Sequence, residues 1–309
     1  MSRILVTGGM GFIGQHAVKA LEAAGHELIL VTRKKNDAKM PDVLCGDLLQ
    51  KGEPERIVKE AQAEYLLHLA WETEHGHFWN AESNHLWKKQ SINLVTSFWE
   101  QGGHRAVCAG SCAEYDWSEE VSKSPLNEYG SPLRPETVYG KCKVDCYRVL
   151  ERLSNDEHSF AWGRVFLLYG RGEAHTRFVP SIITSLLRDL DAKMSSGSQV
   201  RDFLDSRDVG RAFAALMMSD VQGAVNISSG EGVQLVDVAK TICELLGKPN
   251  LLQVGAFPDR AGEPLKLLGA NQRLRDEVGY VPEYSLEEGL EDAIQYWRYK
   301  MVTGEMFCG

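Results

Sequence analysis

Short apolar runs alternate with amphipathic stretches along the first half of the 309-residue chain. The apolar runs are short enough for buried strands, and in the stretches between them the apolar residues recur with helical spacing. Such alternation is typical of a parallel sheet covered by helices on both faces, so we predict a doubly wound α/β fold. The expected strands are RILVTGG, HELILVTR, DVLCGD and YLLHLAW, and the expected helices are FIGQHAVKALEAAG and PERIVKEAQA.

The alternation continues to about residue 170 and then breaks up. Before that point come RAVCAGS, the helix TVYGKCKVDCYRVLERL and the strand FAWGRVFLLYG. After it, the helical segments VPSIITSLLRDL, SRDVGRAFAALMM and LVDVAKTICELLG are separated by short strand-like pieces. We therefore predict a first domain at 1–170, to which parts of about 201–230 return, and a smaller lobe formed mainly by 171–309.

The glycine spacing after the first strand indicates a dinucleotide site. Gly8, Gly11 and Gly14 follow RILVT and stand at the head of the expected helix. Residues without a Cβ let backbone amides approach a pyrophosphate at a helix N-terminus. Glycines also occur in plain tight turns, but this position between strand and helix favours a Rossmann-type cofactor site, with Phe12 and Ile13 in the same turn.

The end of the second expected strand discriminates between the two nicotinamide cofactors. Enzymes that use NAD usually place an acidic residue there to bind the ribose 2′-hydroxyl, whereas a 2′-phosphate needs cations. This chain has Thr32 near that place, and Arg33, Lys34 and Lys35 follow. The basic residues favour NADP, with NAD as the alternative cofactor, although a solvated basic turn would have the same sequence.

The turn after the third expected strand offers a second contact with the nucleotide. Asp47 lies in CGDLL, where its carboxylate can meet the adenine amino group, and Leu48 follows it. An ordinary exposed aspartate in a turn would look the same, so the sequence leaves both interpretations open.

Composition narrows the range of partners. The formal net charge of −9 works against broad attraction to nucleic acid or anionic lipid. No stretch reaches the roughly 18 consecutive apolar residues of a membrane span, and the start, MSRILVTGG, runs directly into a strand pattern, so we expect a cytoplasmic protein. The seven cysteines are scattered without a Cys-x-x-Cys pair, which argues against disulfides and against a metal site.

The segment VYGKCKVDC at 138–146 carries two pairs of residues, each at a spacing of four. On a helix, Tyr139 and Lys143 face nearly the same way, so the ammonium can lower the pKa of the phenol and make proton transfer feasible near neutral pH. Cys142 and Cys146 share that spacing, but no neighbouring Cys or His cluster completes a zinc site. Taken alone, a Tyr and a Lys four apart would usually be a surface pair.

Together, the glycine spacing, Tyr139-x-x-x-Lys143 and Ser111 after RAVCAG resemble the extended short-chain dehydrogenase/reductase family, in particular its nucleotide-sugar epimerases, dehydratases and reductases. The likeness covers nearly the whole chain and includes RVFLLYG, QVRDFLDSRDVGRA, DRAGEP and VGYVPEYSLEEGLEDAIQYW. It implies that Tyr139 transfers the proton, that Lys143 also reaches the nicotinamide ribose, and that the Ser111 hydroxyl holds the substrate carbonyl. It further implies cofactor contacts from Leu69, Ala70 and Trp71 and a sugar contact from Thr73.

The resemblance also implies how the substrate and a second copy of the chain would bind. The family places arginines for a nucleotide diphosphate at positions that match Arg201 and Arg260, with Arg177 as a further candidate. The smaller lobe would then bind a nucleotide-diphosphate sugar. Family members often pair two helices from each subunit into a four-helix bundle, so we expect a homodimer through SINLVTSFWEQ and TVYGKCKVDCYRVL.

The residues after the expected catalytic serine bear on the reaction. The family's dehydratases carry an acid pair, or a near variant with Glu second, in the next two positions. This chain has Cys112 and Ala113 there, with Glu114 one position later, which disfavours a dehydratase. Epimerase-reductases that make GDP-fucose use a cysteine and a histidine where this chain has Ala113 and Arg177. A shifted pair made of Cys112 and His175 stays open.

With dehydration disfavoured and the usual epimerisation pair absent, simple reduction of a ketone is the remaining reaction. Leu167 stands where UDP-galactose-type 4-epimerases usually have asparagine, and the acid for NAD is absent from the second strand. The resemblance therefore favours an NADPH-dependent reductase of a nucleotide-linked 4-keto-6-deoxysugar. The alternatives are a nucleotide-sugar epimerase with transient hydride transfer to bound NAD(P), and a non-catalytic NADP-binding sensor, although such sensors often lose the Tyr-x-x-x-Lys pair. In the His- and Trp-rich segment 68–87, loop positions are expected for His75, His77 and His85, without assigned roles.

Overall fold

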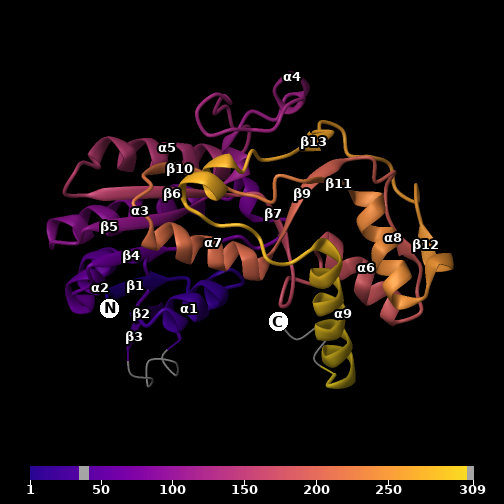
Figure 1. The fold of residues 1–309 in the computed structure, drawn as a ribbon, viewed down its shortest axis with the longest axis horizontal. Coiled ribbons are helices and arrows are strands. Elements are labelled where there is room, and N and C mark those ends of the chain that lie inside the picture. The colour runs from indigo at the N-terminus through magenta and orange to yellow at the C-terminus, as the bar shows by residue number, and fades with distance from the viewer. Residues whose placement is uncertain (35–41, 305–309) are drawn as a thin grey trace.

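A central parallel sheet organises the first part of the chain. The computed structural model describes residues 1–34 and 42–304 (Figure 1). Seven strands form the sheet in the order β10-β6-β5-β4-β1-β2-β3, and every neighbouring pair is parallel. The bounds are β1 Arg3–Thr7, β2 Glu27–Thr32, β3 Val43–Cys45, β4 Tyr65–His68, β5 Arg105–Ser111, β6 Ser159–Val165 and β10 Gly223–Ile227.

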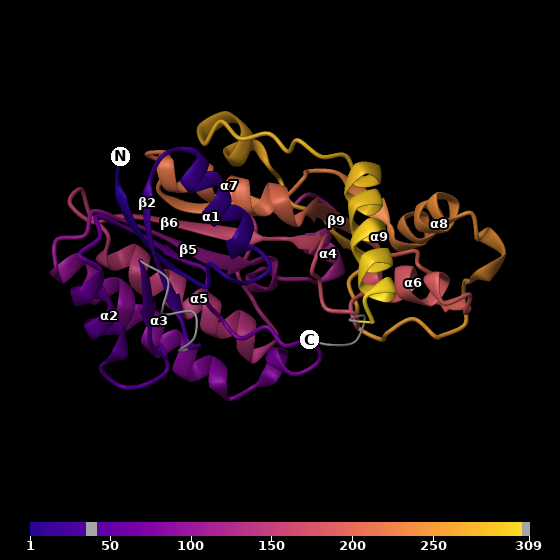
Figure 2. The same ribbon diagram turned by 90° about the horizontal axis from the view of Figure 1, so that it is seen from below.

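Helices cover both faces of this sheet, as Figure 2 shows. α1 and α7 pack together on one face, and α2, α3 and α5 lie on the other. This arrangement confirms the predicted doubly wound α/β fold. None of the helices in the described residues is both long enough and apolar enough to cross a bilayer. The bounds are α1 Gly14–Ala23, α2 Glu53–Ala61, α3 Ser83–Glu100, α5 Val138–Leu153 and α7 Ser206–Met218.

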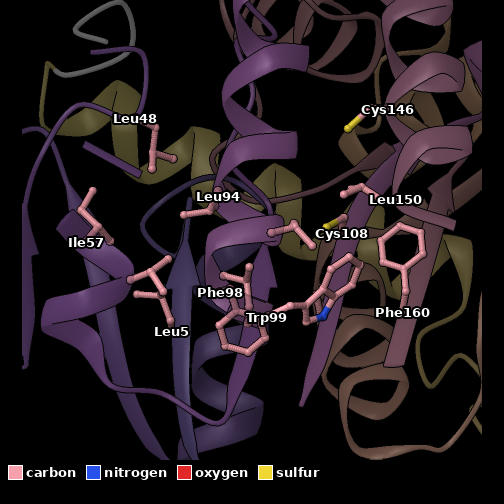
Figure 3. Close-up of a cluster of buried hydrophobic side chains, with 14 of the residues drawn as sticks. Leu5, Leu48, Ile57, Leu94, Phe98, Trp99, Cys108, Cys146, Leu150 and Phe160 are labelled. Carbon is pink, nitrogen blue, oxygen red and sulfur yellow. The ribbon is translucent and has the colours of Figure 1, made fainter. Parts of the chain in front are cut away.

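Successive residues of a central strand enter different cores. Ile4 and Val6 of β1 belong to the core beneath α1 and α7, whereas Leu5 belongs to the core beneath α2, α3 and α5. Figure 3 shows part of this second core, with Ile57 of α2 and Phe98 of α3. A strand buried on both faces needs an unbroken apolar run, which explains why RILVT carries no polar alternation.

Two smaller sheets and a group of three helices lie mainly after residue 170 in the described part of the chain. Strand β9 pairs with β11, β13 and β7, β12 pairs with β8, and a separate core lies among α6, α8 and α9. From the range expected to return to the first domain, α7 and β10 join the large sheet and its helices, and the division at residue 170 stays a prediction. The bounds are β7 Leu167–Tyr169, α6 Phe178–Leu187, β8 Ala192–Lys193, β9 Val200–Asp205, β11 Gly232–Gln234, α8 Leu235–Leu246, β12 Leu252–Gln253, β13 Lys266–Leu267 and α9 Leu286–Val302.

The chain changes sheets at Phe166. The sequence predicted one strand over FAWGRVFLLYG, and this was wrong: β6 pairs with β5 and β10, whereas β7 pairs with β9 of the smaller sheet. An apolar run has the same pattern whether it stays in one sheet or passes into another. The change of sheets packs Leu167 against the cluster that contains Cys112. Short elements complete the described chain: η2 Phe78–Asn80, η3 Cys112–Glu114, α4 Glu119–Ser122, η4 Pro249–Leu251 and η5 Arg273–Glu277.

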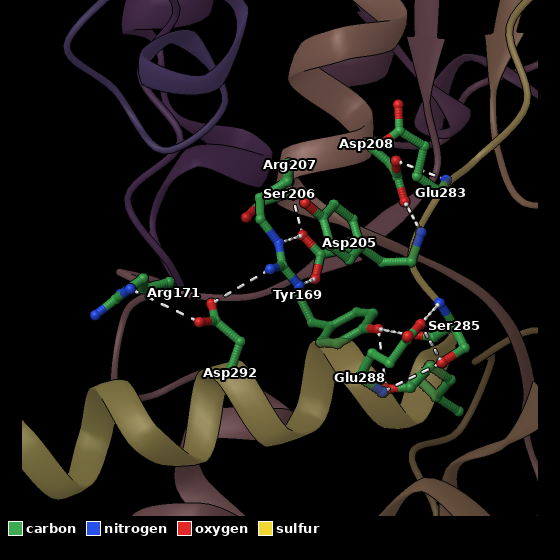
Figure 4. A network of polar contacts seen from close by, with 12 residues as sticks. Tyr169, Arg171, Asp205, Ser206, Arg207, Asp208, Glu283, Ser285, Glu288 and Asp292 are labelled. Carbon is green, nitrogen blue, oxygen red and sulfur yellow. Dashed lines mark hydrogen bonds and ion pairs between the residues drawn. The ribbon is translucent and has the colours of Figure 1, made fainter. Parts of the chain in front are cut away.

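A polar network fastens α9 to the start of α7 (Figure 4). The Asp205 carboxylate caps α7 and pairs with Arg207 at 2.8 Å, and the Arg207 guanidinium also lies 4.0 Å from Asp292 of α9. The Tyr169 hydroxyl donates a 3.1 Å hydrogen bond to a carbonyl in the first turn of α9. Gly289 permits this approach, because a Cβ there would stand 2.2 Å from that hydroxyl oxygen.

Candidate active site

The glycine turn lies against the end of β4. A Cβ at Gly8, whose φ is +74°, would stand 2.7 Å from the backbone nitrogen of Ala70, and a Cβ at Gly14 would stand 2.0 Å from the carbonyl oxygen of Gly8. Only glycine fits these two positions. No side chain from them covers the backbone of the turn at the N-terminus of α1. Such a cradle fits the pyrophosphate of a dinucleotide. Gly11 and Phe12 belong to the same turn, and Ile13 packs against the core beneath α1 and α7.

The residues predicted to bind the adenosine half lie at the ends of β2 and β3. The side chains of Arg33 and Lys34 are exposed, and the Lys34 backbone amide donates to the Thr32 hydroxyl at 3.1 Å. Lys35 lies outside the described residues. The Asp47 carboxylate accepts a 3.1 Å hydrogen bond from the backbone amide two residues later, while the Leu48 side chain points into the core (Figure 3). Leu48 therefore offers a cofactor only its backbone.

Ser111 and Tyr139 come together where β5 meets the N-terminus of α5. Gly140 makes this possible, since a Cβ there would stand 2.3 Å from the carbonyl oxygen of Ala113. The Thr137 hydroxyl caps α5 by accepting from the Gly140 amide at 3.1 Å. Burial raises the pKa of Tyr139, and a hydrogen bond with the Ser111 side chain lowers it in part. Tyr139 in the free site is therefore a protonated phenol, and the expectation that Lys143 lowers its pKa was wrong for the free site, because burial outweighs the charges around the phenol.

Lys143 is buried one turn further along α5. Its Nζ donates a 2.8 Å hydrogen bond to the carbonyl oxygen of Ala109 in β5 and lies 3.7 Å from the centroid of the Trp71 ring. Burial lowers the pKa of Lys143 to about 8. Nearby, His68 bridges Thr7 and Ser91 through its two ring nitrogens at 2.6 and 2.8 Å. Burial, followed by the charge of Lys143, lowers the pKa of His68 to about 3, so His68 adds no second positive charge.

A buried ion pair supports the backbone of Ser111. Glu114 and Arg164 are both fully buried, and the Arg164 Nε lies 2.7 Å from the Glu114 carboxylate. The other carboxylate oxygen of Glu114 accepts hydrogen bonds from the Ser111 amide and from Trp162 Nε1, both at 2.8 Å. The Ser111 hydroxyl in turn accepts from the Ala113 amide at 3.2 Å, which completes a capping box. The Ser-x-x-Glu spacing could have revealed this role of Glu114, whereas nothing in the sequence pointed to Arg164.

The other residues beside Ser111 offer little acid–base capacity. The Cys112 side chain is buried, and burial raises the pKa of its thiol to about 12. Ala113 is buried as well, and Leu167 packs against the cluster around Cys112. Cys146 is fully buried in the core of the large sheet, where it packs as an apolar side chain.

Aromatic rings enclose Tyr139. Phe78 and Trp79 of η2 meet its ring edge-on, with centroids 4.9 and 6.0 Å away, and Trp71 does so at 6.2 Å. Trp117 lies 6.1 Å from Trp79 and donates from its indole nitrogen to a carbonyl of η3 at 2.9 Å. Sequence reasoning gave a site role only to Trp71, because single aromatic residues in a loop have no diagnostic spacing.

Part of the segment that supplies these rings is helical, which the sequence analysis did not expect. Asn84 is buried, and its side-chain nitrogen donates to the carbonyls of Phe78 and Ala81 at 2.7 and 2.9 Å. His85, expected in a loop, lies inside α3, because this helix begins at Ser83. Thr73, expected to contact the sugar, is exposed.

The three arginines predicted to bind the diphosphate differ in burial and in the contacts that they make within the protein. Arg201 is buried in β9; it donates to the carbonyl of Pro264 at 2.9 Å and pairs with Glu263 at 2.7 Å, which joins it to the DRAGEP segment. Arg260, in that segment, is exposed. The Arg177 guanidinium stands at the start of α6, 6.0 Å from the Phe78 ring that packs on Tyr139.

The fold and the site together define a Rossmann-type enzyme of the extended short-chain dehydrogenase/reductase class. The glycine cradle, the buried Tyr–Lys pair and the serine all lie near the carboxyl ends of β1, β4 and β5. The chain belongs to the NAD dependent epimerase/dehydratase family, whose pattern matches residues 4–228. This confirms the family that the sequence resembles.

Relatives with different reactions are similar to this chain over nearly its full length. A UDP-glucose 4-epimerase of Corynebacterium glutamicum is 24% identical, over 98% of this chain and 97% of that protein. A dTDP-4-dehydro-6-deoxy-D-allose reductase of Streptomyces bikiniensis is 25% identical, over 96% of each. The crystal structure of UDP-glucose 4-epimerase from Thermotoga maritima, with UDP-glucose, has the same fold, with a TM-score of 0.84 at 24% identity over 96% of this chain and 99% of that one.

Proposed function

We propose that the chain is an NADPH-dependent reductase of a nucleotide-linked 4-keto-6-deoxysugar. The observation that carries this proposal is the state of the side chains next to Ser111. Dehydration or epimerisation beside the ketone needs a second group that exchanges a proton with carbon. The Glu114 carboxylate is locked by Arg164, and burial keeps the Cys112 thiol protonated. Tyr139 is left to supply the one proton that a ketone reduction requires.

The protein's part in this reaction is to position and donate a proton. The cofactor, when bound, supplies hydride to the carbonyl carbon. The Ser111 hydroxyl orients the carbonyl oxygen, and Tyr139 donates its phenolic proton to that oxygen. Lys143 stabilises the phenolate that results. The raised pKa of Tyr139 in the free site suits this direction, because the phenol is protonated before turnover.

The choice of NADP rests on the basic end of β2. Arg33 and Lys34 are exposed there, so both can turn toward a 2′-phosphate. The family is described as NAD dependent, and NAD therefore stays the alternative cofactor. For the substrate, Arg201 and Arg260 come from adjoining segments of the smaller lobe and would bind the diphosphate. A homodimer and a cytoplasmic location remain predictions.

A nucleotide-sugar epimerase is the second candidate. The UDP-glucose 4-epimerases among the similar proteins favour it. The two functions differ in the fate of the cofactor. An epimerase would return its NAD(P) unchanged after turnover, whereas a reductase consumes the reduced form and exchanges it.

The test is the loss of NADPH absorbance, with NADH in parallel, when the protein meets dTDP-, GDP- and CDP-linked 4-keto-6-deoxysugars. We expect oxidation of NADPH that falls by at least about 100-fold in Tyr139→Phe, since that variant lacks the proton donor. Binding of NADPH by the same variant serves as the control for folding. Isomerisation of a nucleotide sugar without consumption of reduced cofactor would replace the reductase by the epimerase.

A further inference from the structure

The Lys143 ammonium is buried without an ion pair among the described residues. Its exposed fraction is 3%, and within residues 1–34 and 42–304 its Nζ donates one hydrogen bond, to the Ala109 carbonyl. Burying an ammonium without a counter-charge costs free energy. In proteins such a group is normally paired with a carboxylate or loses its proton. The charge of Glu114 acts on Lys143 and raises its pKa, but Glu114 is already paired with Arg164.

The other titratable groups around Lys143 are uncharged. Burial raises the pKa of Cys108 in β5 well above its usual value and that of Cys146 in α5 to about 12, so both are thiols. His68 of β4 is neutral, and Tyr139 of α5 is a phenol. Asp145 of α5 is paired with Lys88 of α3 at 2.9 Å, so among the described residues no carboxylate of α5, β4 or β5 forms an ion pair with Lys143.

The face of the Trp71 ring lies against the Lys143 ammonium, where a counter-ion would be expected. The Lys143 Nζ lies 3.7 Å from the centroid of the Trp71 ring, compared with 5.6 and 5.7 Å for the rings of Trp162 and Tyr139. An ammonium that stands over an indole face, away from water, is attracted by the quadrupole of the ring. We propose that Trp71 is a positioning residue that stands in for a counter-ion beside Lys143 and so keeps the lysine charged for the cofactor. The proposal rests on the dinucleotide site proposed above, but it does not depend on the reaction or the substrate.

The indole is held in this orientation from two sides. Trp71 Nε1 donates a 2.8 Å hydrogen bond to the Asn84 side-chain oxygen, and the Trp87 ring stacks on Trp71 at 6.0 Å with an angle of 24° between the planes. Asn84 cannot turn its amide over, because its nitrogen is engaged by the carbonyls of Phe78 and Ala81. The buried asparagine therefore fixes the ring that faces Lys143.

The experiment is the pH dependence of NADPH binding, followed by the fluorescence of the cofactor from about pH 6 to about pH 10. The wild type should lose affinity above about pH 8, where Lys143 loses its proton. Trp71→Leu keeps an apolar side chain but removes the ring, and we expect its midpoint to fall by about one pH unit. Trp71→Phe retains a weaker ring face and should shift less, which also covers the case in which the leucine variant does not fold.

Trp99→Leu is the matched control. Trp99 of α3 is a buried indole in the core against which Trp71 packs; its exposed fraction is 5%, and its ring stacks on His158. Its midpoint should equal that of the wild type. The proposal is overturned if Trp71→Leu binds NADPH with the wild-type midpoint, if Trp99→Leu shows the same shift, or if the wild type shows no loss of affinity in this range. Because no substrate is added, a failed reductase assay leaves the outcome of this test unaffected.

Discussion

The Glu114 carboxylate and the Arg164 guanidinium form an ion pair with no exposed surface, and the carboxylate also accepts the backbone amide of Ser111. Glu114→Gln would leave the Arg164 charge buried and uncompensated. We expect this change to lower the free energy of unfolding by about 3–5 kcal/mol. It should also reduce kcat, because glutamine has one acceptor oxygen in place of two and cannot hold both the Ser111 amide and Arg164. Chemical denaturation measures the first effect and the reductase assay measures the second.

A surface ion pair provides the comparison for this variant. Glu60 pairs with Arg56 at 2.8 Å one turn away on α2, and both side chains are partly exposed to solvent. Glu60→Gln should change the free energy of unfolding by no more than about 1 kcal/mol. Equal losses in Glu60→Gln and Glu114→Gln would show that burial of the Glu114 pair does not matter.

Lys143 should make the cofactor-free protein more stable as the pH rises above 8. The pKa of Lys143 is lowered to about 8 in the folded protein, whereas the unfolded chain keeps a value of about 10.4. Between these values the unfolded state binds the extra proton, so the free energy of unfolding increases with pH, by at most about 1.4 kcal/mol per pH unit. Denaturation curves at several pH values measure this slope. Lys143→Met should remove the contribution, and Lys141→Met, exposed on the same helix, should retain it.

Arg33 and Lys34 should decide between NADP and NAD. Replacing both by serine removes the cations that would meet the 2′-phosphate, so the Kd for NADPH should rise by about 10- to 100-fold while the Kd for NADH stays nearly constant. Lys59→Ser, on α2, removes one exposed charge elsewhere. Fluorescence titration of each variant with both cofactors measures the effect. An equal loss of affinity for NADH and NADPH would assign the two residues no part in cofactor choice.

Local patterns predicted most of the fold and singled out the residues proposed to be catalytic, but they could not predict contacts between residues far apart in the sequence. Alternating apolar runs predicted the sheet and its helices, and a spacing of four placed Tyr139 and Lys143 on one face of α5. The sequence could not show that Trp71 meets Lys143, because 72 positions separate them and no periodic pattern links a loop residue to a distant helix. For the same reason Arg164, 50 positions after Glu114, looked like an ordinary strand residue.

The two arginines proposed to bind the diphosphate should differ in their effect on stability. Arg260 is exposed, so Arg260→Ala should leave the free energy of unfolding unchanged and raise KM for the nucleotide sugar by about tenfold or more. Arg201 is buried and joins β9 to Glu263 and to the Pro264 carbonyl, so Arg201→Met should raise KM and lower stability together. Steady-state kinetics and denaturation of both variants separate these effects. A normal KM in both would place the diphosphate elsewhere, with Arg177 as the next residue to replace.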